Sequence, residues 1–456
     1  MTAGAASYIA EKDTTLKSLR HIPGEDGWPL VGRMPEMVRD FNGMIHRSYE
    51  QYGEVSRSGS GLMSSGLLVM GPDNCKRIFL DTERNFSAQM GYAKSIGVFY
   101  GGGLLMRDFE DHRFQRRAFQ SAFKNDAMKG YAELMNPIME RGLEGWGSTP
   151  NFLFFPQIKT MLLSVAAKVF FGVDDLGNAA QKLNQAFLDV AEKGIMSIIK
   201  LKIPGLAYYK GWQAKDYMDE FIGKLIPARR AGEGKDFMSY VCKVTKEDGS
   251  FFSDRELMQH LSFLMFAAHD TTTSALSHLV MLLGQHPDIQ ENLRQECRSL
   301  NKEYLDYDDL EKLPNLENAF FESLRLYPSV SMTTRRTIRE CEIGGYRVPG
   351  NTVMMIPPQF NHTMAEWWDE PKKFDPDRFG PARQEQKRHA FSFMPFGGGA
   401  HKCIGMHFAI MNAKCFMHQF LQHYKFSTPA NYNPHMQAVP MPRPSDFLPL
   451  TLEKIR

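Results

Sequence analysis

The chain has few cysteines for its length, and they follow no pattern typical of a disulfide framework. Its 456 residues include six cysteines, at positions 75, 242, 297, 341, 403 and 415, with no CxxC spacing. This usage predicts reduced thiols and a cytoplasmic location. Residues 1–20 contain no secretory signal and no apolar run near the roughly 20 residues that a membrane span needs, so we expect no membrane span.

Excess charge and low-complexity sequence are also absent. The formal net charge is only +2, and basic residues are interleaved with acidic ones, so we expect no nucleic-acid partner. No stretch resembles a linker, a repeat or a charge block, which predicts a single domain over residues 1–456, a monomer, and a loosely ordered lead over residues 1–20. A chain of this length can bury enough apolar surface to enclose a cofactor.

Helical periodicity dominates the chain from Asn74 to about residue 245. The clearest helix begins at Ser253, where Glu256 follows at the spacing of a capping box, and it continues for some 30 residues until Gly284 and Pro287. Three more helices are predicted, from Pro287, over 314–326 and over 404–424.

Strands are predicted only in short segments. Residues 21–32 should run extended, residues 55–70 suggest a small hairpin, and residues 341–356 suggest a Gly-Gly hairpin followed by a strand. A few short strands are expected after residue 424. The predicted fold class is therefore mainly α with small peripheral β-sheets.

The most informative segment is Phe396–Gly405, which reads FGGGAHKCIG. Its three glycines permit a tight backbone turn and a close approach to a flat ligand. Cys403 lies just before a predicted helix, whose N-terminus stabilises a thiolate. Two other interpretations stay open here: a structural cysteine, and a zinc site formed by His401, Cys403 and Cys415, although the spacing for zinc is poor.

This segment resembles the haem-binding loop of the cytochrome P450 family, FxxGxxxCxG, at every fixed position. The resemblance implies the cytochrome P450 fold, with haem b between the long helix and the Cys403 loop and with Cys403 as the iron ligand. It also implies a monooxygenase that uses dioxygen and electrons from NAD(P)H. The haem contacts implied in this loop are Phe396, Gly397, His401, Cys403 and Gly405.

Two further motifs resemble the structural signatures of the same family. Glu322 and Arg325, in AFFESLRLYP, match ExxR and share one face of a helix. Arg378, in FDPDRF, matches the arginine of FxPxRF. The resemblance implies that Glu322, Arg325 and Arg378 form a buried network that braces the Cys403 loop, so Glu322 is not expected to act as a catalytic acid.

In the long helix, the segment AAHDTT resembles the oxygen-activating motif of the family. The resemblance implies that Ala267 lies at the haem and that Asp270 and Thr271 deliver protons to bound dioxygen. The alternative is a threonine that bonds back to the carbonyl four residues earlier. Ala268 replaces the usual glycine, and His269 resembles the sterol-demethylase-like and retinoid-hydroxylase-like branches; whether His269 has a catalytic role stays open.

The resemblance also implies ligands for the haem propionates, which are anionic and favour arginine. His112 and Arg116 lie four residues apart on one face of a helix and match the propionate pair. A third ligand is expected at Arg335, with Arg336 as its close rival.

Apolar side chains are expected to line the pocket for a lipophilic substrate of the steroid, terpenoid or fatty-acyl type. The alternative for each of them is an ordinary core side chain. Substrate identity, regiochemistry and pathway stay open. The expected pocket residues are Tyr92, Phe99, Phe187, Phe263, Phe266, Val330, Met332 and Val439.

Electrons are expected from a ferredoxin and its reductase, or from a flavodoxin-type donor. Arg113, Arg117, Lys402 and Lys414 are expected to guide an acidic donor to the Cys403 side. Two alternative functions stay open: a peroxygenase or isomerase on the same fold, and a non-catalytic haem-binding sensor. The pair Asp270 and Thr271 argues against the first of these.

Overall fold

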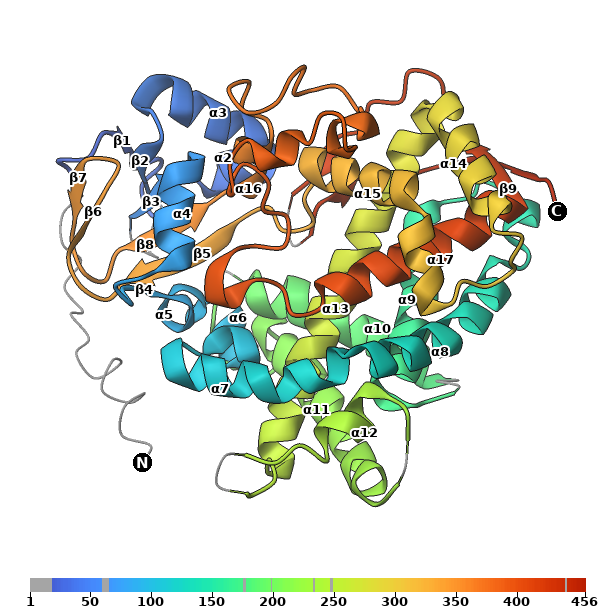
Figure 1. The fold of residues 1–456 in the computed structure, drawn as a ribbon. Coiled ribbons are helices and arrows are strands. Elements are labelled where there is room, and N and C mark those ends of the chain that lie inside the picture. Colours follow the sequence, from blue (N-terminus) through green and yellow to red (C-terminus); the bar gives the residue numbers. More distant parts are fainter. Residues whose placement is uncertain are drawn as a thin grey trace.

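Helices form most of the molecule, and most of the strands lie together at one side of it (Figure 1). The computed structural model describes residues 19–59, 65–174, 178–197, 199–232, 234–246, 249–438 and 441–456. The predicted fold class, mainly α with small sheets, is confirmed. Most of the predicted lead over residues 1–20 lies outside the described residues, and so does Val439.

Helix α13 (Asp254–Gln285) crosses the middle of the molecule (Figure 1). The predicted capping box is present: the Glu256 amide donates to the Ser253 hydroxyl at 3.3 Å, and the Ser253 amide donates to the Glu256 carboxylate at 2.8 Å. Every residue from Thr272 to Gly284 is buried, which is typical of a helix in the interior of a large protein.

Helices α9 (Phe154–Phe171), α11 (Ala207–Ala231), α15 (Pro314–Leu326) and α17 (Met406–His423) pack against α13. A π-helix over Asp189–Ile195 continues α10 and packs on α11. The other α-helices of the described residues are α2 (Met34–Arg39), α3 (Phe41–Tyr52), α4 (Pro72–Leu80), α5 (Ala88–Tyr92), α6 (Ile96–Tyr100), α7 (Phe109–Gln120), α8 (Asn125–Leu143), α10 (Asn178–Leu188), α12 (Phe237–Val241), α14 (Pro287–Ser299) and α16 (Pro358–His362).

Helix α9 has the length and apolar composition of a membrane span, the only described helix that does. However, 67% of it is buried inside the protein. Its buried side chains, such as Ile158, Leu162 and Val169, belong to the largest hydrophobic cluster of the molecule, which also includes residues of α8, α13 and α17. These properties are those of a core helix.

The largest sheet has six strands in the order β1-β2-β3-β8-β5-β4. The expected hairpin is formed by β2 (Val55–Ser58) and β3 (Gly66–Val69). β8 (Val353–Ile356) pairs with β3 in parallel and with β5 (Thr333–Thr337) in antiparallel orientation. Strands β1 (Gly24–Glu25) and β4 (Phe86–Ser87) form the two edges.

Within the described residues, three small sheets have two strands each. In the β6–β7 hairpin, Gly344 and Gly345 have φ of 55° and 79°, as a tight hairpin turn requires. The paired strands are β6 (Cys341–Ile343) with β7 (Tyr346–Val348), β9 (Tyr424–Ser427) with β12 (Thr451–Lys454), and β10 (Met436–Gln437) with β11 (Arg443–Pro444).

Candidate functional site

Residues 396–405, here called the Cys loop, lead directly into α17. Gly397 and Gly399 adopt positive φ, at 69° and 61°, a conformation that glycine reaches without steric cost. The amide of Cys403 donates to the carbonyl oxygen of Phe396 at 2.8 Å. These features fold the loop back on itself and place Cys403 just before the N-terminus of α17.

Two of the loop glycines are required by contacts within the protein. A Cβ on Gly399 would stand 1.7 Å from the carbonyl oxygen of Phe79, and one on Gly398 would stand 2.5 Å from the ring of Phe391. No atom lies within 4 Å of the position that a Cβ on Gly405 would take. Gly398 and Gly399 therefore let the loop pack closely against α4 and Phe391.

The side chain of Cys403 is accessible, yet its surroundings are dense. Burial raises the pKa of the Cys403 thiol, while the Gly405 amide and the charges of Arg116 and Lys402 act in the opposite direction. A backbone N–H and two cations at the sulfur favour a thiolate that could bind a metal.

Two histidines and two arginines meet beside Cys403. The rings of His112 and His401 are stacked, with centroids 3.9 Å apart. Burial, together with the charges of Arg116 and Arg335, lowers the pKa of His112 to about 4. Burial and the same neighbours hold the pKa of His401 well below its usual range. Both imidazoles are therefore neutral near neutral pH, and the positive charge of the group belongs to the two arginines.

Arg335 and Arg336, the two candidates for the third propionate ligand, point in different directions from β5. Arg335 is 4% exposed, and its charge acts on both His112 and His401. The Arg336 guanidinium instead donates to the side-chain oxygen of Asn351 at 3.0 Å. Neighbouring residues of a strand face opposite sides. The structure therefore brings Arg335, and not Arg336, to His112, Arg116 and His401, and these four residues are here called the cationic group.

Arg335 has no ion pair within 4 Å among the described residues. Its guanidinium donates to the carbonyl oxygen of Thr334 at 2.8 Å. The nearest carboxylate contact of the group is between Asp108 and His401, at 3.9 Å. Asp108 is itself held by hydrogen bonds from Ser87 and the amide of Ala88. The charges of Asp108 and Asp81 act on Arg335 only from beyond ion-pair distance, so no described carboxylate pairs directly with it.

The zinc interpretation finds no support. No group of three or more His, Cys, Asp and Glu side chains is arranged to hold a metal ion in the described part of the chain. Cys415 is fully buried on α17 among core side chains, whereas Cys403 is accessible at the Cys loop. His401 and Cys403 thus lack the partners that tetrahedral zinc requires.

Glu322, Arg325 and Arg378 form one buried network. The Arg325 guanidinium donates to both carboxylate oxygens of Glu322, at 2.6 and 2.8 Å. Arg378 donates to Glu322 at 2.9 Å and to Glu385 at 2.7 Å. All four side chains are 0% exposed. Arg325 also donates to the carbonyl oxygen of Pro371 at 2.7 Å, so the network ties α15 to the chain that precedes the Cys loop.

On α13, the hydroxyl of Thr271 donates to the carbonyl oxygen of Ala267 at 2.7 Å. Thr272 and Thr273 make the same bond to the carbonyls four residues earlier, at 2.9 Å in each case. The back-bonded alternative considered for Thr271 is therefore the arrangement in this structure. A hydroxyl in this bond keeps its lone pairs for accepting a hydrogen.

Asp270 is paired with a residue that sequence reasoning missed. Its carboxylate lies 2.9 Å from the ammonium nitrogen of Lys159 on α9, and 3.2 Å from Nδ1 of His269. The signal in the sequence was a lysine near the start of the apolar run FFPQIKTMLLSVAAKVFF. Glu385 was also missed, and its polar neighbourhood, QEQKR, carries no comparable signal.

The predicted substrate residues fall into separate places. Phe263 and Phe266 of α13 pack on Tyr100, with ring centroids 6.1 and 4.8 Å apart. Phe99 faces the other way, against Trp212 of α11 at 4.9 Å. The remaining residues are scattered: Phe187 packs on His269, Tyr92 accepts a hydrogen bond from the Thr334 amide, Met332 packs on the cluster around Phe360, and Val330 is 37% exposed.

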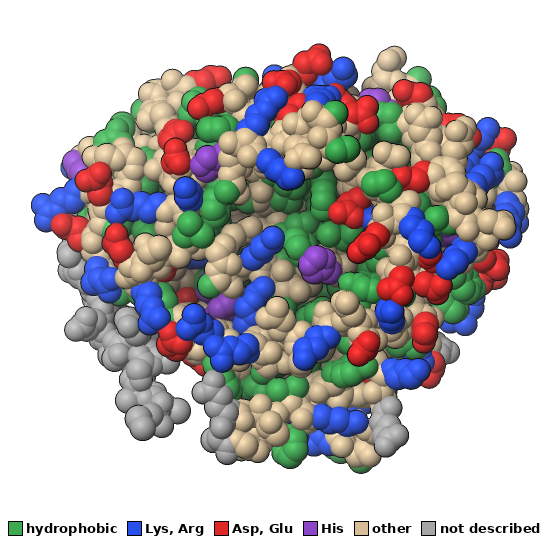
Figure 2. Space-filling model, viewed as in Figure 1, with side chains coloured by type: hydrophobic (Ala, Val, Ile, Leu, Met, Phe, Trp, Pro, Cys, Tyr) green, Lys and Arg blue, Asp and Glu red, His purple; other side chains and the backbone are tan. Residues whose placement is uncertain are grey.

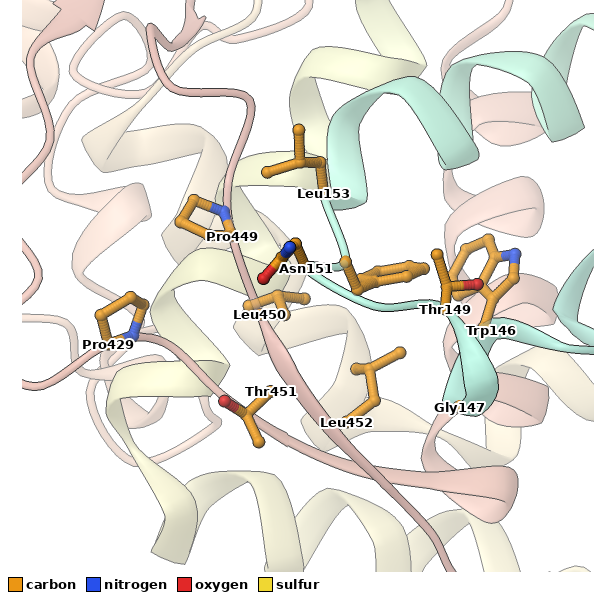
Figure 3. Close-up of a pocket in the computed structure, with 11 residues that line it drawn as sticks. Trp146, Gly147, Thr149, Asn151, Leu153, Pro429, Pro449, Leu450, Thr451 and Leu452 are labelled. Atoms are coloured by element: carbon orange, nitrogen blue, oxygen red, sulfur yellow. The ribbon is translucent and has the colours of Figure 1, made fainter.

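A surface depression lies between the segment before α9 and the C-terminal strand β12 (Figure 3). Trp146, Asn151, Leu153 and Leu450 are among the residues that line it. None of the predicted substrate residues lines it. This depression is therefore distinct from the site around Cys403.

Lys and Arg side chains gather over α7 on the face drawn in Figure 2. Arg113 and Arg117 of α7 and Lys402 of the Cys loop are exposed. The prediction for Lys414 was wrong: this side chain is 2% exposed, donates to the carbonyl oxygen of Leu310 at 2.7 Å and pairs with Glu317. It is buried because α17 runs inside the molecule, so Lys414 meets no partner protein.

The donor set around Cys403 fits haem b. The cofactor needs one strong axial ligand and cationic partners for two carboxylates. Cys403 supplies an accessible sulfur with a stabilising N–H, and Arg116 and Arg335 supply positive charge with which no described carboxylate forms an ion pair. A haem with its propionates at these arginines would complete the site.

Comparison with known proteins agrees with this reading. The family model described as Cytochrome P450 matches residues 22–448. A putative cytochrome P450 136 from Mycobacterium tuberculosis is 34% identical, over 95% of this chain and 89% of its own length. A taxane 13-alpha-hydroxylase from Taxus cuspidata is 27% identical, over 95% of this chain and 92% of its own. A cyanobacterial P450 structure with retinoic acid bound has a TM-score of 0.86 and 27% identity, over 95% of this chain and 99% of its own.

Proposed function

This chain belongs to the cytochrome P450 family, and we propose that it oxidises a lipophilic small molecule of the steroid, terpenoid or related isoprenoid type. The family supports a haem monooxygenase in general. The observation that carries the assignment to this site is the accessible sulfur of Cys403 beside the two arginines, Arg116 and Arg335.

In this proposal, bound haem supplies the oxygen-activating chemistry and the chain's residues hold it. Cys403 is the iron ligand, with its thiolate stabilised by the Gly405 amide. Arg116, Arg335 and the neutral imidazole of His112 hold the propionates. Ala267, Phe396, Gly397, His401 and Gly405 complete the haem contacts, and Glu322, Arg325 and Arg378 brace the Cys loop.

Asp270 and Thr271 are the proposed proton-delivering residues. Thr271 presents its hydroxyl on α13 and can accept a hydrogen while it donates to Ala267. Asp270, the adjacent residue, is the proposed acid that passes protons from solvent toward Thr271. Replacement of Thr271 by Ala should release hydrogen peroxide at the expense of product; unchanged coupling would contradict this role and favour a peroxygenase.

The substrate class is supported by the relatives and by the aromatic surface of α6 and α13. The taxane hydroxylase and the retinoic acid complex both concern isoprenoid compounds by their names. Tyr100, Phe263 and Phe266 form an aromatic cluster close to the Thr271 region of α13. Titration with retinoic acid and taxanes, followed by the change of the haem absorption band, tests this class.

Electrons from NAD(P)H are proposed to arrive through a ferredoxin or flavodoxin-type donor. The exposed side chains of Arg113, Arg117 and Lys402 favour an acidic partner on this face. All six cysteines are free thiols, which suits work in the reducing cytoplasm. A rise in the apparent KM for the donor when Arg113 and Lys402 are replaced by Glu would support this face.

The decisive experiment on the cofactor is optical. The reduced protein with carbon monoxide should absorb near ~450 nm, as thiolate-ligated haem does. Cys403→Ser should lose this band, whereas Cys341→Ser, at a half-buried thiol outside the site, should keep it. A band only near ~420 nm in freshly prepared wild-type protein would contradict the thiolate assignment. A chain that keeps the band but shows no turnover with any donor would be a haem-binding sensor.

A further inference from the structure

We propose that Tyr100 and Asp219 form a polar anchor for the substrate, and that this anchor selects an isoprenoid or steroid that carries a free hydroxyl group. The inference rests on the proposed function, because it names the substrate group that the same site recognises. It adds a residue of α11 to a site otherwise built from α6, α7, α13 and the Cys loop.

Tyr100 ends α6, which packs on α13 (Figure 1). Its ring stacks on Phe266 and meets the ring of Phe263 edge-on, with centroids 4.8 and 6.1 Å apart. The ammonium nitrogen of Lys215, on α11, lies 5.5 Å from the centre of the same ring, within the range of a cation–π contact. These contacts fix the ring and therefore the position of the hydroxyl at its end.

Packing alone does not require a hydroxyl at this position. The neighbouring Phe99 packs on Trp212 and Tyr208 of α11, with ring centroids 4.9 and 5.7 Å apart, and has no polar atom to satisfy. A phenylalanine at position 100 would stack on Phe266 as well as a tyrosine does. The hydroxyl of Tyr100 is therefore an addition that the aromatic packing leaves unexplained.

The Tyr100 hydroxyl is buried but has no hydrogen-bond partner among the described residues. The residue is only 2% exposed. Burial and the charges of Asp219 and Asp270 raise the pKa of this hydroxyl well above its ordinary value, so it keeps its hydrogen. Buried polar groups in proteins are almost always hydrogen-bonded. The Tyr100 hydroxyl is thus a free donor held in an apolar place.

Asp219 of α11 supplies a free acceptor to the same place. One of its carboxylate oxygens pairs with Lys215, the residue that also contacts the Tyr100 ring. The other oxygen, Oδ1, is buried and has no partner among the described residues. Lys215 contacts both Tyr100 and Asp219 through one ammonium group, so the free donor and the free acceptor lie close together.

The two free groups complement each other but are not joined. A hydrogen bond from Tyr100 to Asp219 would satisfy both, yet both atoms lack a partner. A group that bridges them must accept from Tyr100 and donate to Asp219 at the same time. A hydroxyl does both, whereas a carbonyl, an ether or a carboxylate only accepts. The anchor therefore favours an alcohol.

The charge of the anchor also favours a neutral group. Lys215 and Asp219 compensate each other, and Lys215 is only 5% exposed. A ligand carboxylate at this place would be buried without a cation of its own and would meet the charge of Asp219, which is costly. A ligand hydroxyl meets neither cost.

The anchor lies within reach of the proposed oxygen-activating residues. Phe266, which stacks on Tyr100, precedes Thr271 by five residues on α13, a rise of roughly 7.5 Å. A substrate whose hydroxyl is held at Tyr100 can therefore lay its carbon skeleton along the aromatic cluster toward Thr271. The anchor would orient a molecule that the apolar surface alone would hold in many directions.

The first test uses stability and needs no substrate. Tyr100→Phe removes a hydroxyl that has no partner in the protein, so the urea midpoint of the haem-loaded protein should stay the same or rise. Tyr131→Phe is the matched control, because the buried Tyr131 hydroxyl donates to the carbonyl oxygen of Ala122 at 2.8 Å, and its midpoint should fall. An equal fall in both variants would overturn the proposal, since the Tyr100 hydroxyl would then be satisfied inside the protein.

The second test measures binding to the haem-loaded protein through the shift of the haem absorption band. The probes share one carbon skeleton: retinol, the hydrocarbon that lacks only the hydroxyl oxygen of retinol, and retinoic acid. The wild type should bind retinol at least about tenfold more tightly than retinoic acid. Asp219→Asn should narrow this preference, because the amide that replaces the carboxylate can donate to retinoic acid. An unchanged preference would overturn the role of Asp219.

Tyr100→Phe is the decisive variant in this series. It should weaken retinol binding about tenfold and leave the hydrocarbon within about twofold of the wild type. Tyr304→Phe is the control, because it removes a hydroxyl that donates to Glu140 outside the site, and it should change neither compound. Equal effects of Tyr100→Phe on retinol and the hydrocarbon, or no effect on either, would overturn the proposal.

The outcomes separate the anchor from the proposed function. Oxidation of a lipophilic compound by a protein that binds none of the three probes, or that binds them without preference for retinol, would overturn only the anchor. Absence of turnover with any donor and lipophilic compound, in protein that shows the thiolate band and binds no probe, would overturn both the anchor and the monooxygenase function.

Discussion

His401 of the Cys loop is stacked on His112 of α7, with ring centroids 3.9 Å apart and planes inclined by 29°. The contact joins the loop that carries Cys403 to the helix that carries Arg116. Both rings have lowered pKa values because of burial and the nearby arginines, so the stack is one of neutral rings. It fixes the spacing between the sulfur and the cationic group without adding charge.

Loss of this ring stack should weaken haem binding. His112→Ala removes the ring and a donor for a propionate, and we expect the rate of haem loss to a scavenging apoprotein to rise about tenfold, equivalent to ~1.4 kcal/mol. Arg113→Ala, at the next and 66% exposed position, is the control and should lose haem at the wild-type rate. Equal rates in the two variants would contradict a haem contact for His112.

The buried network behind the Cys loop should be far more sensitive than a surface ion pair. Glu322→Gln leaves the guanidinium groups of Arg325 and Arg378 without their shared carboxylate, and we expect a loss of about 3–5 kcal/mol in the free energy of unfolding. Glu220→Gln, in the exposed pair with Lys224, should cost no more than about 1 kcal/mol. Urea unfolding measures both, and similar losses would show that the network is not structural.

Local patterns predicted the parts of the fold that depend on neighbours in sequence. The start of α13 follows from its capping box, the start of α15 from Pro314, and the β6–β7 turn from Gly344 and Gly345. The network of Glu322, Arg325 and Arg378 was accessible only through resemblance, because its two halves are more than 50 residues apart.

Tertiary packing determines the side-chain positions that the sequence left open or predicted wrongly. Arg335 rather than Arg336 reaches the cationic group because the pairing of β5 turns alternate side chains to opposite faces. Lys414 was expected at the surface, yet α17 is buried on nearly all sides. The pairing of Lys159 with Asp270 joins two helices 111 positions apart, and no local pattern encodes such a contact.

Gly399 of the Cys loop should tolerate substitution less well than Gly345, a glycine that also has positive φ but lies in the β6–β7 turn. Gly399→Ala combines positive φ with a Cβ 1.7 Å from the Phe79 carbonyl oxygen, so we expect little folded, haem-loaded protein. Gly345→Ala has a similar φ of 79° but no atom within 4 Å, and it should cost only about 1–2 kcal/mol. The yield of the ~450 nm band measures both; equal yields would show that the contact with α4 is dispensable.

Buried neutral histidines should make the protein sensitive to mild acid, and His278 is the clearest test. Burial lowers the pKa of His278 to about 3, whereas its unfolded value is about 6.5. Between pH 6.5 and the folded pKa, His278 binds a proton in the unfolded state but not in the folded state. The free energy of unfolding therefore falls as the pH is lowered through this range. His278→Phe keeps a ring to stack on Tyr327, which lies 5.0 Å away by ring centroids, and removes the titration.

The expected result is a difference in the free energy of unfolding between the wild type and His278→Phe that grows as the pH falls. The two proteins should have similar free energies of unfolding at about pH 7.5, and His278→Phe should be more stable by about 2 kcal/mol at about pH 5. Urea unfolding at both values measures the gap. His435→Phe, at an exposed histidine near the C-terminus, should show no such gap, and a gap of equal size there would mean that the acid sensitivity does not come from burial.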